Sequence, residues 1–220
     1  MELSEAIKAR HSVRSYSDKP IEPEKKKILQ GKIDEINKES GLHIQLISDE
    51  PKAFDSFMAH YGKFSGVTNY FALIGKKGEG LYEKCGYYGE ELVLLAQQLG
   101  LNTCWVAMSY SKVKSAYQLG AGEKLSLVIS LGYGNTQGKA HKSKAAGEVS
   151  KADEPADWFT AGVEAALLAP TAMNQQKFSF EKKGDTVSAS AGAGFYSKVD
   201  LGIAKLHFEI GAGAENFKWA

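Results

Sequence analysis

The sequence predicts an α+β protein that is built from two related α/β halves. Segments with helical periodicity alternate with segments of strand character along most of the chain. The order helix, small-residue loop, strand occurs over residues 22–47 and again over residues 155–181. Each half is too short to bury a good core alone, so we expect residues 1–220 to form a single domain whose halves, about 1–150 and about 151–220, pack on each other.

The composition is that of an ordinary globular protein and excludes several classes of function. The 220 residues are 43% hydrophobic and 24% charged, with a net charge of +1, which gives no general attraction to nucleic acid or anionic membranes. No apolar run reaches membrane-spanning length, and the start lacks the layout of a signal peptide. Cys85 and Cys104 have no metal-type spacing, and we expect buried or semi-buried free thiols in preference to a disulfide. We therefore expect a cytoplasmic protein with no nucleic-acid or membrane partner and no metal.

Helices are expected wherever apolar residues recur at helical spacing. The strongest is 82–99, where Leu92, Leu95 and Leu99 share one face and Gly100 suits a left-handed C-cap. Pro23 is well placed in the first turn of another helix. The expected helices are residues 2–9, 23–40, 53–61, 82–99, 112–119, 156–168 and 196–211.

Strands are expected where apolar residues alternate or form short runs between turn residues. The expected strands are residues 43–47, 67–74, 103–107, 125–133, 178–181 and 186–190. The last two flank Lys183-Gly184-Asp185 and predict a hairpin. Residues 134–148 are polar and rich in Gly and Lys, and we expect an extended surface arm there.

The first basic stretch, Arg10-His11-Ser12-Val13-Arg14-Ser15-Tyr16, is the first candidate for a binding site. Guanidinium groups form bidentate, charge-assisted bonds to phosphate oxygens, and a serine hydroxyl and backbone N–H groups can supply further donors. The stretch therefore favours a phosphate site. A solvated basic turn is the alternative reading of so short a motif.

Four stretches together resemble the FMN-dependent nitroreductase family, and in particular its divergent TM-type subgroup. The basic stretch is similar to the family's flavin-phosphate motif, and residues 169–176 (APTAMNQQ) resemble its loop with Pro, Asn and Gln. Residues 100–106 (GLNTCWV) resemble the segment that approaches the flavin ring. Residues 131–134 (LGYG), with the lysines that follow, resemble the turn and basic tail near the phosphate. The resemblance implies a three-layer α/β/α nitroreductase-like fold.

The order of these stretches departs from the ordinary family pattern. Ordinary members carry the Asn-containing loop after the first helix, where this chain has only residues 38–41; here the loop lies in the second half. Ordinary members are homodimers whose flavin lies at the subunit interface. We therefore expect an intrachain pseudo-dimer with one site per monomeric chain, and a true homodimer with two sites is the alternative.

The resemblance assigns roles to the phosphate side of the site. The residues expected to hold the FMN phosphate are Arg10, Ser12, Lys142 and Lys144. Arg14 would place a cation near the N1 and O2 edge of the flavin and stabilise its reduced, anionic form. His11 would contribute backbone or stack beside the ring, or be a solvated histidine, and the lysines are equally consistent with a solvated surface run.

The resemblance also assigns residues to the flavin ring. Those expected to present backbone near its redox-active edge are Trp105, Val106, Ala107 and Met108. Those expected to line the ring or ribityl chain from the other half are Pro170, Thr171, Ala172 and Asn174. Trp105 could instead be a core residue, and the second loop could be a helix-ending turn with Asn174 as its cap.

The implied activity is hydride transfer from NAD(P)H through FMN N5 to a nitroaromatic, quinone or similar small acceptor, with ping-pong kinetics. No side chain is expected to act as a nucleophile or general base. Family members often have Glu-Gly where this chain has Ala107-Met108. The alternative is therefore a flavin-binding or degenerate nitroreductase-like protein without efficient turnover.

Overall fold

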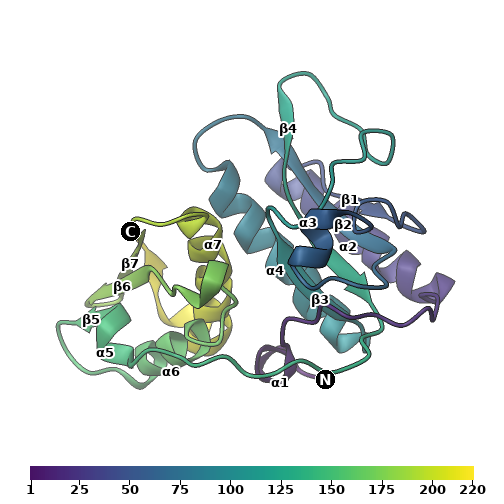
Figure 1. The fold of residues 1–220 in the computed structure, drawn as a ribbon. Helices are drawn as coiled ribbons and strands as arrows, with labels where there is room; N and C mark the ends of the chain where they lie inside the picture. The colour runs from purple at the N-terminus through teal and green to yellow at the C-terminus, as the bar shows by residue number, and fades with distance from the viewer. The chain divides into compact units, whose positions relative to one another are not determined.

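The computed structural model describes residues 1–220, which form two compact units (Figure 1). Unit 1 comprises Met1–Ala9, Tyr82–Glu91 and Ala140–Ala220, and unit 2 comprises Arg10–Leu81 and Leu92–Lys139. Each unit is therefore assembled from separate stretches of the chain. No helix combines the length and the apolar character needed to cross a membrane.

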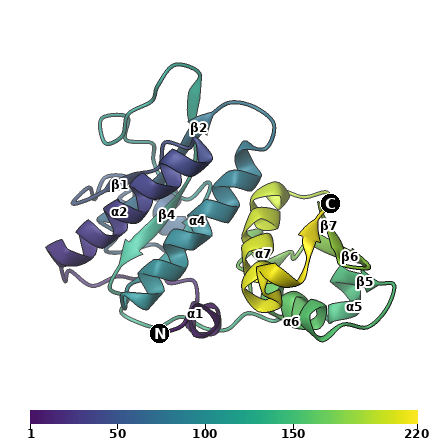
Figure 2. The same ribbon diagram turned by 180° about the vertical axis from the view of Figure 1, so that it is seen from behind.

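Unit 2 contains an antiparallel sheet with strand order β1-β2-β4-β3. Its strands are β1 (Gln45–Ile47), β2 (Asn69–Lys76), β3 (Asn102–Val106) and β4 (Glu123–Gly132). Helix α2 (Pro23–Ser40) and the C-terminal part of α4 (Leu81–Gln98) lie on one face, and α3 (Phe57–Tyr61) lies on the other (Figures 1 and 2).

The central strand β2 is buried on both faces because both faces are covered. Tyr70, Ala72 and Ile74 belong to one buried cluster, on the face that carries α3. Phe71 and Leu73 point to the opposite face and are fully buried. A nearly continuous apolar run is therefore the pattern that this position in the sheet requires.

Unit 1 contains a second sheet, with strand order β5-β6-β7-β8. Its strands are β5 (Ser150–Ala152), β6 (Phe178–Lys183), β7 (Thr186–Ala191) and β8 (Lys218–Trp219), and its helices are α1 (Leu3–Ala9), α5 (Ala146–Val149), α6 (Asp157–Ala166) and α7 (Ser197–Ala212), with 3₁₀ turns at Ala172–Asn174 and Ala214–Asn216. Residues along β6 alternate between buried and exposed, so one face packs on the helices; the rings of Phe180 and Phe208 stack at 4.6 Å.

The repeated order of elements expected from the sequence is present in the structure. The first set of elements along the chain is α2, β1, β2, α4 and β3, and the corresponding elements later in the chain are α6, β6, β7, α7 and β8. The first two strands of each set pair antiparallel. Strand β8 pairs parallel to β7, and β3 runs in the same direction as β2 because β4 separates them. The intrachain pseudo-dimer itself stays a prediction.

Most of the expected helices and strands are confirmed, with ends that differ by a few residues. Residues 112–119 do not form a helix, and this prediction was wrong. They form an irregular turn because Val113, Ala116 and Tyr117 pack against the core of unit 2. The side chain of Gln45 also bonds the backbone N–H and C=O of Gln118, which a helix would use internally.

Two further differences concern short elements. Only Phe57–Tyr61 of the expected helix 53–61 is helical, because Ser56 caps its N-terminus by accepting a bond from Ala59 N. The expected surface arm is attached to the protein at several points, and it contains α5 and runs directly into β5, which was not predicted. A three-residue strand carries too little periodicity to be recognised in a sequence.

Candidate functional site

The basic stretch lies in extended form along the outer edge of β3 in unit 2. Val13 N donates to Thr103 O at 3.0 Å, and Ser12 forms a parallel bridge with Thr103. Further on, Tyr16 N donates to Ser65 O at 3.0 Å and Ser65 N donates to Arg14 O at 2.9 Å. The stretch is therefore an ordered extension of the sheet.

A buried tyrosine fixes this stretch in place. The Tyr16 hydroxyl donates to Val13 O at 2.8 Å and shares a hydrogen bond with Ser130 Oγ on β4, also at 2.8 Å. Burial raises the pKa of Tyr16 well above its ordinary value, so the hydroxyl keeps its proton. Val13 and Tyr16 thus face the core and hold the residues between them against the sheet.

Three residues of the basic stretch act on the buried thiol of Cys104. Burial raises the pKa of Cys104, whereas the charge of Arg14, a hydrogen bond with Ser12 and the charge of Arg10 oppose the rise. The stretch therefore brings two guanidinium groups, from Arg10 and Arg14, and the Ser12 hydroxyl into the surroundings of one buried thiol.

The two arginines differ in exposure. Arg10 is only 4% exposed, so the alternative of a solvated basic turn is wrong for this residue. Arg14 is exposed, and its guanidinium lies 5.8 Å from the centre of the Phe64 ring. Next to it, Ser15 Oγ accepts bonds from Ser65 Oγ at 3.1 Å and from Asn135 Nδ2 at 2.9 Å. Sequence reasoning missed these neighbours because they lie about 50 and 120 residues away.

The other predicted residues of unit 2 lie at the end of β3. Trp105 and Val106 pair with Ile129 and Val128 of β4, and Val106 is buried. Ala107 and Met108 follow the strand, and Met108 is 66% exposed. His11 is partly exposed and lies against Gly138.

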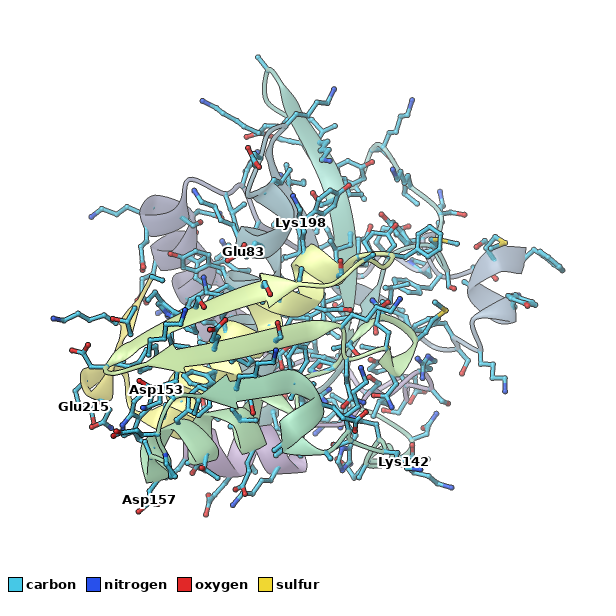
Figure 3. The ribbon with its side chains drawn as sticks, turned by 90° about the vertical axis from the view of Figure 1, so that its left-hand side faces the viewer. Glu83, Lys142, Asp153, Asp157, Lys198 and Glu215 are labelled. Atoms are coloured by element: carbon cyan, nitrogen blue, oxygen red, sulfur yellow. The ribbon has the colours of Figure 1, made fainter.

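In unit 1, the second group of predicted residues surrounds a buried glutamine. Gln176 is 2% exposed; its Nε2 donates to Lys142 O and to Asn174 Oδ1, both at 2.9 Å. Its Oε1 accepts from Lys144 N, and its carbonyl accepts from Lys144 Nζ, each at 2.9 Å. Lys144 therefore fastens the loop, whereas the Lys142 side chain points away from unit 1 into solvent (Figure 3).

The loop itself is held in an unusual backbone conformation. Met173, Asn174 and Gln176 have φ values of 51°, 53° and 46°. The left-handed region costs free energy for residues other than glycine, and such strain is frequent at functional sites. Asn174 Nδ2 donates to Lys142 O at 2.8 Å, so its side chain does not cap α6.

Asp200 on α7 anchors the other side of this loop. Its carboxylate accepts bonds from Ala172 N at 2.9 Å and from Gln175 Nε2 at 2.7 Å. Burial raises the pKa of Asp200 to about 6, although these two hydrogen bonds oppose the rise. Sequence reasoning missed Asp200 because its position in an amphipathic helix gives no sign of its partners.

The attached arm supports the same loop. The His141 ring nitrogen Nε2 and the Ser143 hydroxyl both donate to Leu167 O, at 3.0 and 2.9 Å. Gln176 N donates to Thr171 Oγ1 at 3.1 Å, and Pro170 is buried at the start of the loop.

The predicted site residues form two sets, one in each unit. The set in unit 2 is Arg10, His11, Ser12, Arg14, Trp105, Val106, Ala107 and Met108, and the set in unit 1 is Lys142, Lys144, Pro170, Thr171, Ala172 and Asn174.

The Arg-x-Ser-x-Arg stretch and the Pro/Asn/Gln loop are two of the stretches that resemble the nitroreductase family in the sequence. The sequence pattern of the family described as "Putative TM nitroreductase" matches residues 2–212. The chain belongs to this family. A search among curated proteins found no match.

Solved structures confirm the fold. A protein of Thermotoga maritima described as a putative nitroreductase is 24% identical, with a TM-score of 0.70 over 98% of this chain and 85% of that chain. A "Putative NADH dehydrogenase/NAD(P)H nitroreductase" of Bacteroides thetaiotaomicron is 22% identical, with a TM-score of 0.53 over 67% of this chain and 95% of that chain. A nitroreductase family protein of Streptococcus pneumoniae is 14% identical, with a TM-score of 0.55 over 67% of this chain and 98% of that chain.

Proposed function

We propose that the protein is an FMN-dependent oxidoreductase that transfers hydride from NAD(P)H to nitroaromatics, quinones or similar small acceptors. The observation that carries this proposal is the ordered basic stretch, which holds Arg10, Ser12 and Arg14 close together along the edge of β3. When FMN is bound, its N5 supplies the centre that accepts and donates hydride. Membership in the nitroreductase family supports the proposal.

The donor chemistry of unit 2 fits the phosphate and the polar ring edge of FMN. Arg10 and Ser12 would hold phosphate oxygens, because guanidinium and hydroxyl donors make short, charge-assisted bonds. Arg14 keeps its guanidinium exposed and would place a positive charge where the reduced ring carries negative charge. Trp105, Val106, Ala107 and Met108 would offer backbone and apolar surface to the ring.

In unit 1, the strained loop would supply ring or ribityl contacts through Pro170, Thr171, Ala172 and Asn174. Lys144 is proposed as a residue that positions this loop, since its ammonium already donates to a backbone carbonyl. Lys142 extends into solvent and would contribute mainly through its charge. Holding the loop in one conformation before binding reduces the entropy lost when a ligand binds.

The nicotinamide and the acceptor would bind in turn, which predicts ping-pong kinetics. No side chain of either set is proposed as a nucleophile or a general base. The second candidate function is a flavin-binding protein without efficient turnover. Ala107-Met108 favours this candidate, because these two residues stand where many family members have Glu-Gly.

Flavin content and turnover test the proposal directly. The purified protein should show a flavin absorption spectrum, and NADH or NADPH should bleach it and support reduction of a nitroaromatic. One FMN per chain on a monomer would support the pseudo-dimer, and the same ratio on a dimer would support the ordinary homodimer. Bound flavin that neither nicotinamide reduces would favour the second candidate. No uptake of added FMN would refute both.

A pair of variants separates the proposed site from a general effect of charge. Arg14→Gln should weaken FMN binding by about tenfold or more, because a charge-assisted contact contributes about 1.5–3 kcal/mol. Lys27→Gln removes an exposed cation on α2 of the same unit and should leave the affinity unchanged. Equal losses in both variants would contradict the assignment of Arg14.

A further inference from the structure

Strand β1 forms one edge of the sheet in unit 2, and its pairing with β2 decides which backbone groups face outward. His43 N donates to Ile74 O at 2.8 Å, and the register continues with Gln45 opposite Ala72. In an antiparallel pair, hydrogen-bonded and non-hydrogen-bonded positions alternate. The N–H and C=O groups of Ile44 and Leu46 therefore point away from β2.

The protein satisfies only the first of these two outward positions. The side chain of Asn37 on α2 accepts from Ile44 N at 2.8 Å and donates to Ile44 O at 2.9 Å. This amide pairs with the strand as a neighbouring strand would. The backbone N–H and C=O of Leu46 have no partner in the protein, so one donor and one acceptor of the edge stay available.

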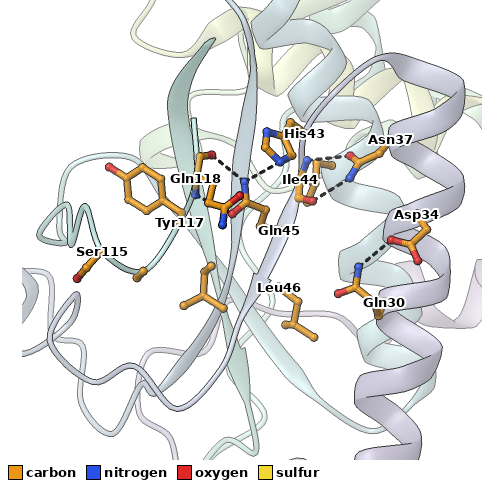
Figure 4. A pocket seen from close by; sticks show the side chains of 12 residues that line it. Gln30, Asp34, Asn37, His43, Ile44, Gln45, Leu46, Ser115, Tyr117 and Gln118 are labelled. Atoms are coloured by element: carbon orange, nitrogen blue, oxygen red, sulfur yellow. Dashed lines mark hydrogen bonds between the residues drawn. The ribbon is translucent and has the colours of Figure 1, made fainter. Parts of the chain in front are cut away.

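The open position lies in a groove of about 470 Å³. Figure 4 shows Gln30 and Asp34 of α2 on one side and Ser115, Tyr117 and Gln118 on the other. The second wall is fixed because the amide of Gln45 bonds the backbone of Gln118 at 2.8 and 2.9 Å. Asp34 is the only acidic residue among those that line the groove, and no lysine or arginine lines it.

Unit 1 shows that an added strand fits the corresponding edge. Strand β6 occupies the place in the element order that β1 occupies in unit 2. Its outer edge carries β5, which pairs in parallel from Ser150 opposite Phe180 to Ala152 opposite Lys182. The corresponding outer edge of β1 carries no strand.

We propose that the groove along β1 binds an extended segment of a partner protein, which adds to the sheet as a short parallel strand. Leu46 would supply two main-chain hydrogen bonds, which is how strand addition gives affinity. The partner residue opposite Leu46 would point to the same face, toward α2 and Asp34, and should therefore be basic. Its two neighbours would point toward Ala116 and Tyr117 and should be apolar. This site is independent of the proposed flavin chemistry.

The walls of the groove argue for a flexible segment over a second folded copy. Because β1 is recessed between α2 and residues 115–118, the same walls on a second copy would keep two β1 edges from meeting. A free extended chain of a few residues has no such obstruction. The alternation of apolar and basic residues gives the partner a recognisable sequence pattern.

The probe for this test is the capped peptide acetyl-Thr-Val-Lys-Val-Thr-amide, titrated into ¹⁵N-labelled protein. In the free protein, the Leu46 amide should exchange with solvent faster than those of Gln45 and Ile47, which bond to β2. Saturating peptide should shift the Leu46 amide signal and slow its exchange. No binding at millimolar peptide would overturn the proposal.

Two methylated peptides test the hydrogen bonds. In a parallel arrangement, the valine after the lysine donates its N–H to Leu46 O, whereas the N–H of the lysine points away. N-methylation of that valine should weaken binding by about tenfold or more, and N-methylation of the lysine should have little effect. Binding that tolerates both changes would overturn strand addition, and the reverse pattern would overturn the parallel orientation.

A charge change on the wall tests recognition of the basic residue. Asp34→Lys should weaken binding by at least about threefold, because it replaces attraction with repulsion at an exposed site. Glu35→Lys makes the same change on the next residue of α2, outside the groove, and should leave binding unchanged. Equal effects would overturn the assignment of Asp34. A protein dimer that slows exchange at Leu46 would overturn the partner segment in favour of a second copy.

Discussion

Replacing Gly202 with alanine should destabilise unit 1 through the crossing of two helices. A Cβ at Gly202 of α7 would lie 2.0 Å from Glu83 O and 2.7 Å from Tyr87 N in the first half of α4. At the same crossing, a Cβ at Gly86 of α4 would lie 2.1 Å from Val199 O. The two backbones touch where each helix has no side chain, so neither helix can accept a methyl group without moving.

The size of the effect follows from the overlap. Real Cβ contacts essentially never fall below 3.0 Å, and 3.0 minus 2.0 leaves about 1.0 Å that the helices must separate. Overpacking against rigid atoms costs about 3 kcal/mol, and the better helix propensity of alanine returns about 1 kcal/mol. The net loss is about 2 kcal/mol, which corresponds to a fall in Tm of about 4–8 °C for a chain of this length.

Thermal unfolding followed by circular dichroism measures this change, with Gly31→Ala as the control. Gly31 lies inside α2 with nothing within 4 Å of its Cβ position, so alanine should raise the stability by about 0.5–1 kcal/mol. Because Asp200 lies on α7 beside Gly202 and anchors the loop of residues 170–176, G202A should also reduce FMN retention. A G202A protein as stable as G31A would refute the close helix contact.

Three more predictions concern charged groups. The pKa of Asp200 is raised from 3.8 to about 6, so the folded state binds more protons than the unfolded state between these pH values. The free energy of unfolding should therefore fall by about 3 kcal/mol as the pH rises from 4 to 6. Asp200→Asn should remove this pH dependence, as measured by urea unfolding. Lys144→Met should lower the free energy of unfolding by about 1 kcal/mol in the thermal unfolding assay, because the hydrogen bond to Gln176 O is lost. Lys142→Met, at a side chain that extends into solvent, should change it by less than about 0.5 kcal/mol. The hydroxyl of Tyr133 donates to Glu22 and holds the pKa of this carboxyl group at about 2. Tyr133→Phe should therefore raise the pKa of Glu22 toward 4.5 in an NMR titration, and an unchanged pKa would contradict the assigned bond. The ionised Glu22 stabilises the wild-type protein above pH 4.5, this stability is lost as the pH falls from 4.5 to 2, and it should be smaller in the variant.

The sequence determined the local elements because their signals are short-range. Helical spacing identified α2, α4 and α7, and Gly100 takes the left-handed conformation expected after α4, with φ of 74°. The hairpin of β6 and β7 followed from alternation around the turn at Gly184. The family also followed from the sequence, because its motifs are contiguous stretches.

The tertiary structure alone decided how distant residues meet. Nothing near residues 112–119 shows that Val113 and Tyr117 pack on a core that prevents the expected helix. Likewise, the side chain of Asp200 and that of Gln176 bond residues that lie 25 to 34 positions away, so their roles in the loop have no local signature.

The same reason explains the division into units and the open edge of β1. Residues 1–9 and 82–91 belong to unit 1 because of the long-range packing of α1 and α4, which no periodicity within those segments records. Strand β1 reads as an ordinary alternating segment, and only its pairing shows that Asn37 covers Ile44 and leaves Leu46 open. Spacing along the chain fixes which residues share a face, whereas packing between elements decides what that face meets.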